Sequence, residues 1–273
     1  MCRVFSVSRS GYYSWRRRPE SRRSIENRRM IAHIKVIYNN SKGRYGSPKI
    51  TDELNDMGFP VSKNRVARRM KEAGIRSIVR RKHRVTTDSK HSHPVADNIL
   101  QRDFTASAPN RVWVSDITYI ATTGGWMYLT VFIDLFSRMV VGWALSSSLS
   151  AEMVLVALQR CIRNRHPGAG LIIHSDRGVQ YACHDFRKAL KKHGFIQSMS
   201  RKGDCWDNAV AESFFGILKT ELVHHERFRG PQDTLRALFE YIEVFYNRKR
   251  KHSTLCYQTP DQFERAMKSA VCF

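Results

Sequence analysis

The stretch from residue 111 to residue 145 constrains the fold of this chain more than any other. Three runs rich in β-branched and aromatic residues follow one another there, at residues 111–120, 126–135 and 138–145. The sequence TTGG separates the first two runs, and the last two are joined tightly through Phe136 and Ser137. We therefore expect three antiparallel strands at the start of a sheet.

Helical and strand patterns alternate after these three runs. The chain shows a helical pattern from Ser150, a strand at 171–175, a helix at 181–193, a strand at 195–200 and a long helix at 208–224. This order is the α/β layout of the ribonuclease-H-like fold. We expect that catalytic core at residues 109–228 and a C-terminal helical extension at residues 229–273.

The first part of the chain predicts helices alone. Residues 1–40 form an N-terminal helical segment, whose first helix is expected to be capped by Ser8, and residues 41–78 have the pattern of a helix-turn-helix. Its first helix is expected to be capped by Ser47, which precedes a proline, and its second by Ser62. Gly74 then ends the second helix.

The second helix of this helix-turn-helix is strongly basic. It turns four cations outward, at a density that fits phosphate and base-edge contact in a major groove: Lys63, Arg65, Arg68 and Arg69. A solvated charged face is the simpler alternative. DNA contact is favoured because few acids are available nearby to pair with these cations.

The charge of the chain is unevenly distributed. The net charge is +23, and residues 1–90 alone hold 24 Lys and Arg against 7 Asp and Glu. A basic front half favours a polyanion, and the lack of an 18-residue apolar run favours nucleic acid over a membrane. Residues 79–108 predict a basic linker. With no signal-peptide core at the N-terminus, we expect a cytoplasmic, nucleoid-associated protein that binds double-stranded DNA.

Three acids stand out in the second half of the chain. Asp116 shares a strand face with valines, Asp176 follows the end of the fourth strand, and Glu212 lies in the first turns of the long helix. We expect Asp207 and Asn208 to cap that helix. The three acids can then converge at one edge of the sheet.

Oxygen ligands of this kind select a hard cation, Mg²⁺ or Mn²⁺, and two such ions suit phosphodiester chemistry. The six cysteines form no C-x-x-C pair, which argues against zinc. Any single Asp at a strand end is more often a turn residue. We interpret Asp134 in that way, as a hairpin-turn acid that pairs with Arg138.

Three sequence blocks together resemble those of DDE transposases from bacterial insertion sequences, specifically the second-reading-frame product, in the superfamily of retroviral integrases. They are WVSDITYI around Asp116, HSDRGVQY around Asp176 and SMSRKGDCWDNAVAESFFGILKTE around Glu212, with 35 residues between the last two acids. The helix-turn-helix segment and the stretch FYNRKRKHSTLCYQTP are similar to that family as well.

The resemblance implies a transposase that nicks DNA at the ends of its element with water and then uses the freed 3′-hydroxyl for strand transfer. Asp116, Asp176 and Glu212 would be its catalytic and metal-binding residues. Lys219 matches a basic position of the family and is expected to touch DNA. The family also implies a homo-oligomer on paired ends and a protein or fusion from an upstream reading frame. Arg201 and Lys202, in the loop before the long helix, are further expected DNA contacts.

Two other readings stay open at this point. A catalytically silent DNA-binding regulator of the element would bind its ends without cutting. A nuclease of the ribonuclease H type would act on RNA–DNA hybrids, but such enzymes generally use a fourth carboxylate, and we assign no residue of this sequence to that role.

Overall fold

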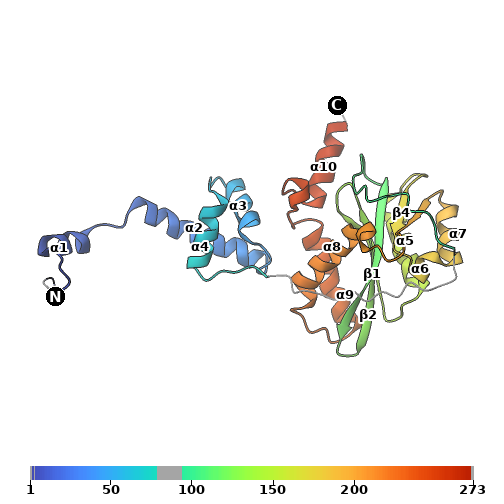
Figure 1. Ribbon diagram of the computed structural model, residues 1–273, viewed down its shortest axis with the longest axis horizontal. Coiled ribbons are helices and arrows are strands. Elements are labelled where there is room, and N and C mark those ends of the chain that lie inside the picture. Colours follow the sequence, from blue (N-terminus) through green and yellow to red (C-terminus); the bar gives the residue numbers. More distant parts are fainter. Residues whose placement is uncertain (1, 3, 79–93, 272–273) are drawn as a thin grey trace. The chain divides into compact units, whose positions relative to one another are not determined.

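The computed structural model describes residues 2, 4–78 and 94–271. The chain divides into two compact units, Met1–Ile78 and Val79–Phe273. Figure 1 shows both units coloured along the sequence. None of the helices in the described residues has both the length and the apolar character needed to cross a lipid bilayer.

The described residues of the N-terminal unit form helices joined by short connections. They are α1 (Arg9–Arg17), α2 (Arg22–Asn40), α3 (Ser47–Asp56) and α4 (Lys63–Glu72). Helices α2, α3 and α4 contact one another around a core in which Ile34, Ile50, Leu54 and Val66 are fully buried. The predicted helix-turn-helix is therefore present, with α3 and α4 as its two helices.

Two of the three predicted helix caps in this unit are confirmed. The hydroxyl oxygens of Ser8 and Ser62 accept backbone N–H bonds at the starts of α1 and α4. The predicted cap at Ser47 is wrong by one residue, because Ser47 is already helical and the extended residue before it is Gly46. Pro48 occupies the first turn, where its missing N–H costs nothing.

The second unit is built on a five-stranded sheet. Its strands are β1 (Val112–Thr122), β2 (Gly125–Asp134), β3 (Val140–Ser146), β4 (Ile172–Ser175) and β5 (Ile196–Met199). Their order across the sheet is β3-β2-β1-β4-β5. The first three strands pair antiparallel, and β4 and β5 run parallel to β1. The predicted α/β core of the ribonuclease-H-like class is confirmed.

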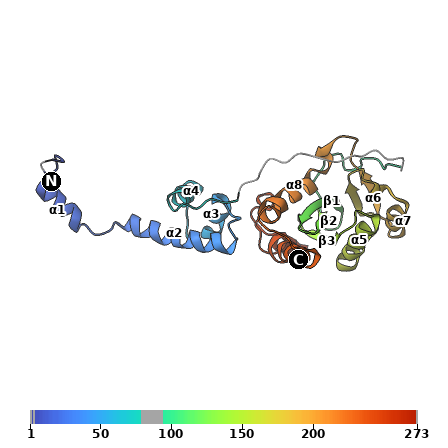
Figure 2. The same ribbon diagram turned by 90° about the horizontal axis from the view of Figure 1, so that it is seen from below.

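Helices cover both faces of this sheet, as Figure 2 shows. On one face lie α5 (Ala151–Arg165), α6 (Val179–Ala182) and α7 (His184–Lys192). On the other lie a short 3₁₀ turn η1 (Cys205–Asn208), α8 (Ala209–Leu218) and its π-helical continuation η2 (Lys219–Val223). The chain then forms α9 (Pro231–Phe239), η3 (Glu240–Tyr246), η4 (Ser253–Leu255) and α10 (Pro260–Val271).

The main hydrophobic core fills the space between the sheet and α5–α7. Its centre includes Trp113, Phe132 and Leu158, which are almost completely buried. Helix α5 comes so close to β3 that a Cβ on Gly142 would stand 2.3 Å from the Sγ atom of Cys161. Only glycine allows this approach, which fixes α5 against the strands that carry the site.

Asp134 ends β2 and is fully buried. Its Oδ1 atom accepts the backbone N–H of Phe136 at 2.9 Å, so the predicted turn role is present. The predicted pairing with Arg138 is wrong. The Arg138 guanidinium donates to a backbone carbonyl instead. The cation that pairs with Asp134 is Arg165. Arg165 also bonds to Glu264, which lies 99 residues further along the chain.

The described part of the predicted linker, residues 94–108, lies against the sheet. The backbone N–H groups of Ile99 and Leu100 donate to the Ser198 hydroxyl on β5, and the Leu100 side chain is buried. Residues 79–93 of the predicted linker lie outside the described residues. This packing brings the segment around residue 100 to the edge of the sheet where β4 and β5 end.

Candidate active site

Asp116 lies in the middle of the sheet. It belongs to β1, which has β2 on one side and β4 on the other, and it is half-buried. Its Oδ1 atom accepts the backbone N–H of Ile117 at 2.7 Å. The neighbouring side chain, Ser115, is fully buried and lies 2.8 Å from the Tyr181 hydroxyl. These contacts hold the strand and its carboxylate in place.

Asp176 lies next to Asp116 because of the parallel pairing of β1 and β4. Val114 pairs with His174, and each acid follows two positions later in its own strand direction. The Oδ1 atom of Asp176 accepts the backbone N–H of Gly178 at 2.9 Å. A Cβ on Gly178 would stand 2.9 Å from that same oxygen, so a larger residue there would displace the carboxylate.

Glu212 approaches from the helix that covers this part of the sheet. It lies in the first turn of α8, and its side chain is exposed. Helix α8 contacts β1, and the Nδ2 atom of Asn208 donates to the Ser115 carbonyl oxygen at 3.2 Å. Asn208 precedes Glu212 by four residues, so this bond holds the start of the helix that carries Glu212 against the strand that carries Asp116.

The electrostatics of the site show that the three acids act on one another. Burial raises the pKa of Asp116 well above its ordinary value, and the charges of Asp176 and Glu212 raise it further. The Ile117 N–H and the Lys219 ammonium act in the opposite direction. Burial lowers the pKa of Lys219, and its attraction to Asp116 opposes that shift. A cation at this cluster would relieve the repulsion among the acids.

The donor set fits a hard cation in its chemistry, since its charged groups are carboxylates without Cys or His. In the part of the chain that the structure describes, no three His, Cys, Asp or Glu side chains are already arranged to hold a metal ion. Asp116, Asp176 and Glu212 interact electrostatically, but their side chains are not arranged as a complete metal site.

Comparison with known proteins identifies the family of this chain. The chain matches a model of an integrase core domain at residues 106–205, a second integrase core model at 212–267 and an HTH-like domain at 24–83. It is 42% identical over 266 residues to transposase InsF of insertion sequence IS3A from Escherichia coli strain K12, covering 97% of this chain and 92% of that protein. The chain belongs to the IS3 family of insertion-sequence transposases.

Two further similarities agree with this assignment. A 31 kDa protein of insertion element IS600 from Shigella sonnei is 43% identical over 263 residues, covering 96% of this chain and 97% of that protein. A structure of the simian T-cell lymphotropic virus intasome with the PP2A regulatory subunit B56 gamma aligns with a TM-score of 0.50 and 16% identity, over 85% of this chain and 74% of that one. The second similarity concerns the fold alone.

The four cations predicted to bind DNA lie on α4, the second helix of the helix-turn-helix, and they differ in their surroundings. Lys63 and Arg68 are exposed. The Arg65 guanidinium bonds to Asn27 at 2.9 Å and to a glutamate on α2, and Arg69 forms an ion pair with Glu72 at 2.6 Å. Two of the four are thus partly committed within the unit, and DNA contact by all four stays a prediction.

The loop before α8 differs more from the sequence-based expectation. Arg201, predicted to touch DNA, forms an ion pair with Asp207 at 2.8 Å, although its side chain remains 55% exposed. Lys202 is exposed. The predicted capping role of Asp207 is wrong, because its carboxylate is fully buried and bonds to arginines and an asparagine instead of the helix N–H groups. DNA contact by Arg201 and Lys202 stays a prediction.

Sequence reasoning missed several residues that shape the site. Gly178 and Tyr181 belong to the sequence block around Asp176, but their contacts depend on the fold. These contacts are the close approach of Gly178 to the Asp176 carboxylate and the buried contact between the Tyr181 and Ser115 hydroxyls. Asn208 was noticed only as a cap, whereas its side chain bonds to the strand next to Asp116. No local signal distinguishes an Asn that caps a helix from one that reaches a strand.

Proposed function

We propose that this transposase nicks DNA at the 3′ ends of its insertion sequence and transfers the freed ends to target DNA, with Asp116, Asp176 and Glu212 as catalytic residues. The supporting observation is their convergence. Asp116 and Asp176 follow a paired position on adjacent parallel strands, and the charge of Glu212 raises the pKa of Asp116. Acids gathered in a chain of net charge +23 favour a cation-dependent reaction on a polyanion.

The three carboxylates would hold two Mg²⁺ or Mn²⁺ ions. When bound, such ions activate the attacking oxygen and stabilise the leaving oxygen of a phosphodiester. The chain's own part is to orient the acids. The Ile117 N–H stabilises ionised Asp116, and the Gly178 N–H fixes one oxygen of Asp176.

Basic residues would bring the DNA to this site. The Lys219 ammonium lies close enough to interact with Asp116, at the point where the helix widens into its π-helical continuation. The Lys219 ammonium would attract a phosphate to this place, which favours a bound strand next to the carboxylates. The cations of α4 would bind the duplex elsewhere along its length. We further propose that paired ends are held by a homo-oligomer.

The test is cleavage and strand transfer on a labelled duplex that carries an end of the element, with Mg²⁺ or Mn²⁺. Asp176→Asn and Glu212→Gln should reduce both products to the uncatalysed background while DNA binding persists, because each removes one metal-binding charge. The matched controls are Asp185→Asn and Glu226→Gln, which neutralise exposed acids on other elements. These controls should cut like the natural chain.

The other readings predict different results. A regulator would bind the end and never cut, even with the upstream-frame protein added, and the variants would behave like the natural chain. A hybrid nuclease would prefer an RNA–DNA duplex over the DNA end. Either result would overturn the proposed function.

A further inference from the structure

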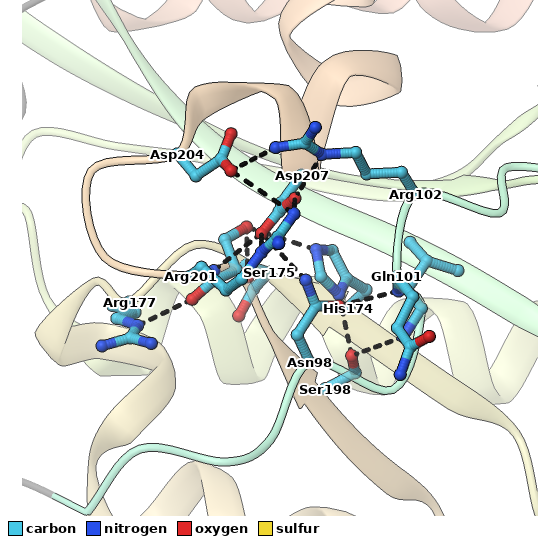
Figure 3. A network of polar contacts seen from close by, with 12 residues as sticks. Asn98, Gln101, Arg102, His174, Ser175, Arg177, Ser198, Arg201, Asp204 and Asp207 are labelled. Atoms are coloured by element: carbon cyan, nitrogen blue, oxygen red, sulfur yellow. Dashed lines mark hydrogen bonds and ion pairs between the residues drawn. The ribbon is translucent and has the colours of Figure 1, made fainter.

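Asp207 is the centre of a polar network next to the candidate active site, shown in Figure 3. It lies in the 3₁₀ turn that leads into α8, and its side chain is fully buried. The backbone N–H and the guanidinium of Arg201 donate to it at 2.8–3.0 Å. Arg102 Nε and Asn98 Nδ2 each donate to it at 2.8 Å. These bonds hold the pKa of Asp207 well below its ordinary value.

The network joins segments that are far apart in the sequence. Arg102 and Asn98 belong to the segment that runs along the sheet before β1, and Arg201 belongs to the loop after β5. Arg102 also pairs with Asp204 in that loop. Asp207 therefore ties the start of α8 to two separate backbone segments at the same edge of the sheet.

The segment around Arg102 adopts a costly backbone conformation to reach Asp207. Gln101 and Arg102 both have positive φ angles, +46° and +66°, which side chains other than glycine rarely adopt. The Asn98 side chain accepts the N–H of Gln101 at 2.9 Å and so stabilises this bend. Strained conformations of this kind persist where surrounding contacts over-determine them, and they cluster at functional sites.

The network also includes uncharged side chains at the ends of β4 and β5. His174 lies between the hydroxyls of Ser198 and Ser200, at 2.9 and 3.2 Å. Burial lowers the pKa of His174 to about 4, so its ring is neutral near pH 7. Ser198 in turn holds the backbone of Ile99. The ends of β4 and β5 therefore bind the segment that carries partners of Asp207.

Asn208, the next residue, provides a second attachment on the other side. Its side chain donates to the carbonyl of Ser115, directly before Asp116. The adjacent side chains of Asp207 and Asn208 thus connect one helix start both to the β4–β5 edge and to β1. Glu212 follows four residues after Asn208, within the first turn of α8.

We propose that Asp207 is a positioning residue that fixes Glu212 against Asp116 and Asp176 through the start of α8. This rests on the proposed function, in which Glu212 is a catalytic residue. Arg102 and Arg201 hold Asp207, so the positioning depends on them as well. Their side chains are 42% and 55% exposed, whereas the Asp207 side chain is fully buried.

The test compares Asp207→Asn with Glu264→Gln in the full chain. Glu264 is a matched control because it too is a buried carboxylate that binds an arginine fork, with both oxygens 2.8 Å from Arg165. Three quantities are measured for each: thermal unfolding, affinity for an element-end duplex, and single-turnover cleavage as a function of Mn²⁺ concentration.

For Asp207→Asn we expect unchanged DNA affinity, a cleavage rate lower by about ten- to a hundredfold, and a higher Mn²⁺ concentration for half-maximal rate, because a displaced ligand binds metal less tightly. Excess Mn²⁺ should partly restore this rate, as Glu212 is still present. Arg102→Gln should shift the Mn²⁺ dependence in the same direction by less, since Arg201 still holds Asp207. Glu264→Gln should leave the Mn²⁺ dependence unchanged.

The proposal would be overturned if the cleavage rates of Asp207→Asn and Arg102→Gln both depended on Mn²⁺ concentration as the rate of the natural chain does. So would equal Mn²⁺ shifts in Asp207→Asn and Glu264→Gln, since that is the result of a general loss of stability. Glu212→Gln, assayed in parallel, separates this failure from that of the proposed function. If Glu212→Gln is inactive while Asp207→Asn is normal, the catalytic assignment stands and the positioning role falls.

Discussion

The two ends of the helix that carries Glu212 are both anchored by a carboxylate bound to arginine, but in different surroundings. At the start, Asp207 is held by Arg102 and Arg201, whose side chains reach solvent. At the far end, Glu221 in the π-helical continuation is held by Arg250, and both side chains are only 9% exposed. The comparison indicates two different roles for ion pairs in this unit. The pairs of Asp207 orient the start of the helix, and the pair of Glu221 attaches the C-terminal extension.

The far end is the more completely buried of the two. Arg250 donates to both oxygens of Glu221, at 2.8–3.1 Å, and the Tyr241 hydroxyl donates to Glu221 at 2.9 Å. Arg250 and Tyr241 both belong to the part of the chain after α8. Since removing one partner of a buried pair strands the other charge, loss of either Glu221 or Arg250 alone should destabilise the second unit.

The largest effect should come from breaking the buried pair. Glu221→Leu leaves the Arg250 cation without its carboxylate, and we expect a loss of about 3–5 kcal/mol in unfolding free energy. The double variant with Arg250→Met should recover most of that loss, because neither charge is then buried alone. Urea unfolding measures both, with Asp261→Asn as control, because Asp261 pairs with Arg265, whose side chain is 76% exposed. A single-variant loss as small as that of the control would remove the contrast between the two ends.

A smaller effect should separate the ends by pH. The pKa of Asp207 lies below the ordinary value of 3.8, so the unfolded chain takes up this proton first as the pH falls. The stability that ionised Asp207 provides is therefore complete above about pH 5 and is lost as the pH falls through 3.8 and below. Urea midpoints measured from pH 6 to pH 3 should fall more steeply for the natural chain than for Asp207→Asn. Parallel curves would mean that Asp207 contributes nothing to stability.

The smallest effect concerns salt. Arg102 is accessible to ions, so the loss of stability caused by Arg102→Gln should shrink between low salt and about 1 M NaCl, where charges are screened within about 3 Å. The loss caused by Arg250→Met should change little, because its partner is buried. Urea midpoints at the two salt concentrations measure this, and equal salt dependence for the two variants would contradict the distinction.

The sequence predicted most of the framework. Strands with alternating or continuous apolar runs and helices with clear caps were placed correctly, since their signals are local. The three acids were found through their order along the chain and the resemblance of their blocks. Their roles stay predictions, although the structure brings them together.

The errors about charged side chains share one physical cause, which is that partners distant in sequence decide the role of such a side chain. Asp207 precedes a helix and so predicts a cap, yet Arg102, 105 residues away, binds it. Asp134 was paired with its neighbour Arg138, whereas Arg165 on α5 reaches it. Arg250 lies in the basic stretch NRKRKH, and only the fold buries it against Glu221. No local pattern contains these pairings.

The strand order also has a consequence for how the protein is made. The β1–β2–β3 meander pairs neighbours in the sequence, so it can form as soon as residues 112–146 have been synthesised. β4 joins β1 from 60 residues further on, and α8 must arrive later still. Asp116 is therefore present in an early folding unit, while Asp176 and Glu212 reach it later in synthesis. A partly synthesised chain would hold the meander without the complete set of proposed catalytic acids.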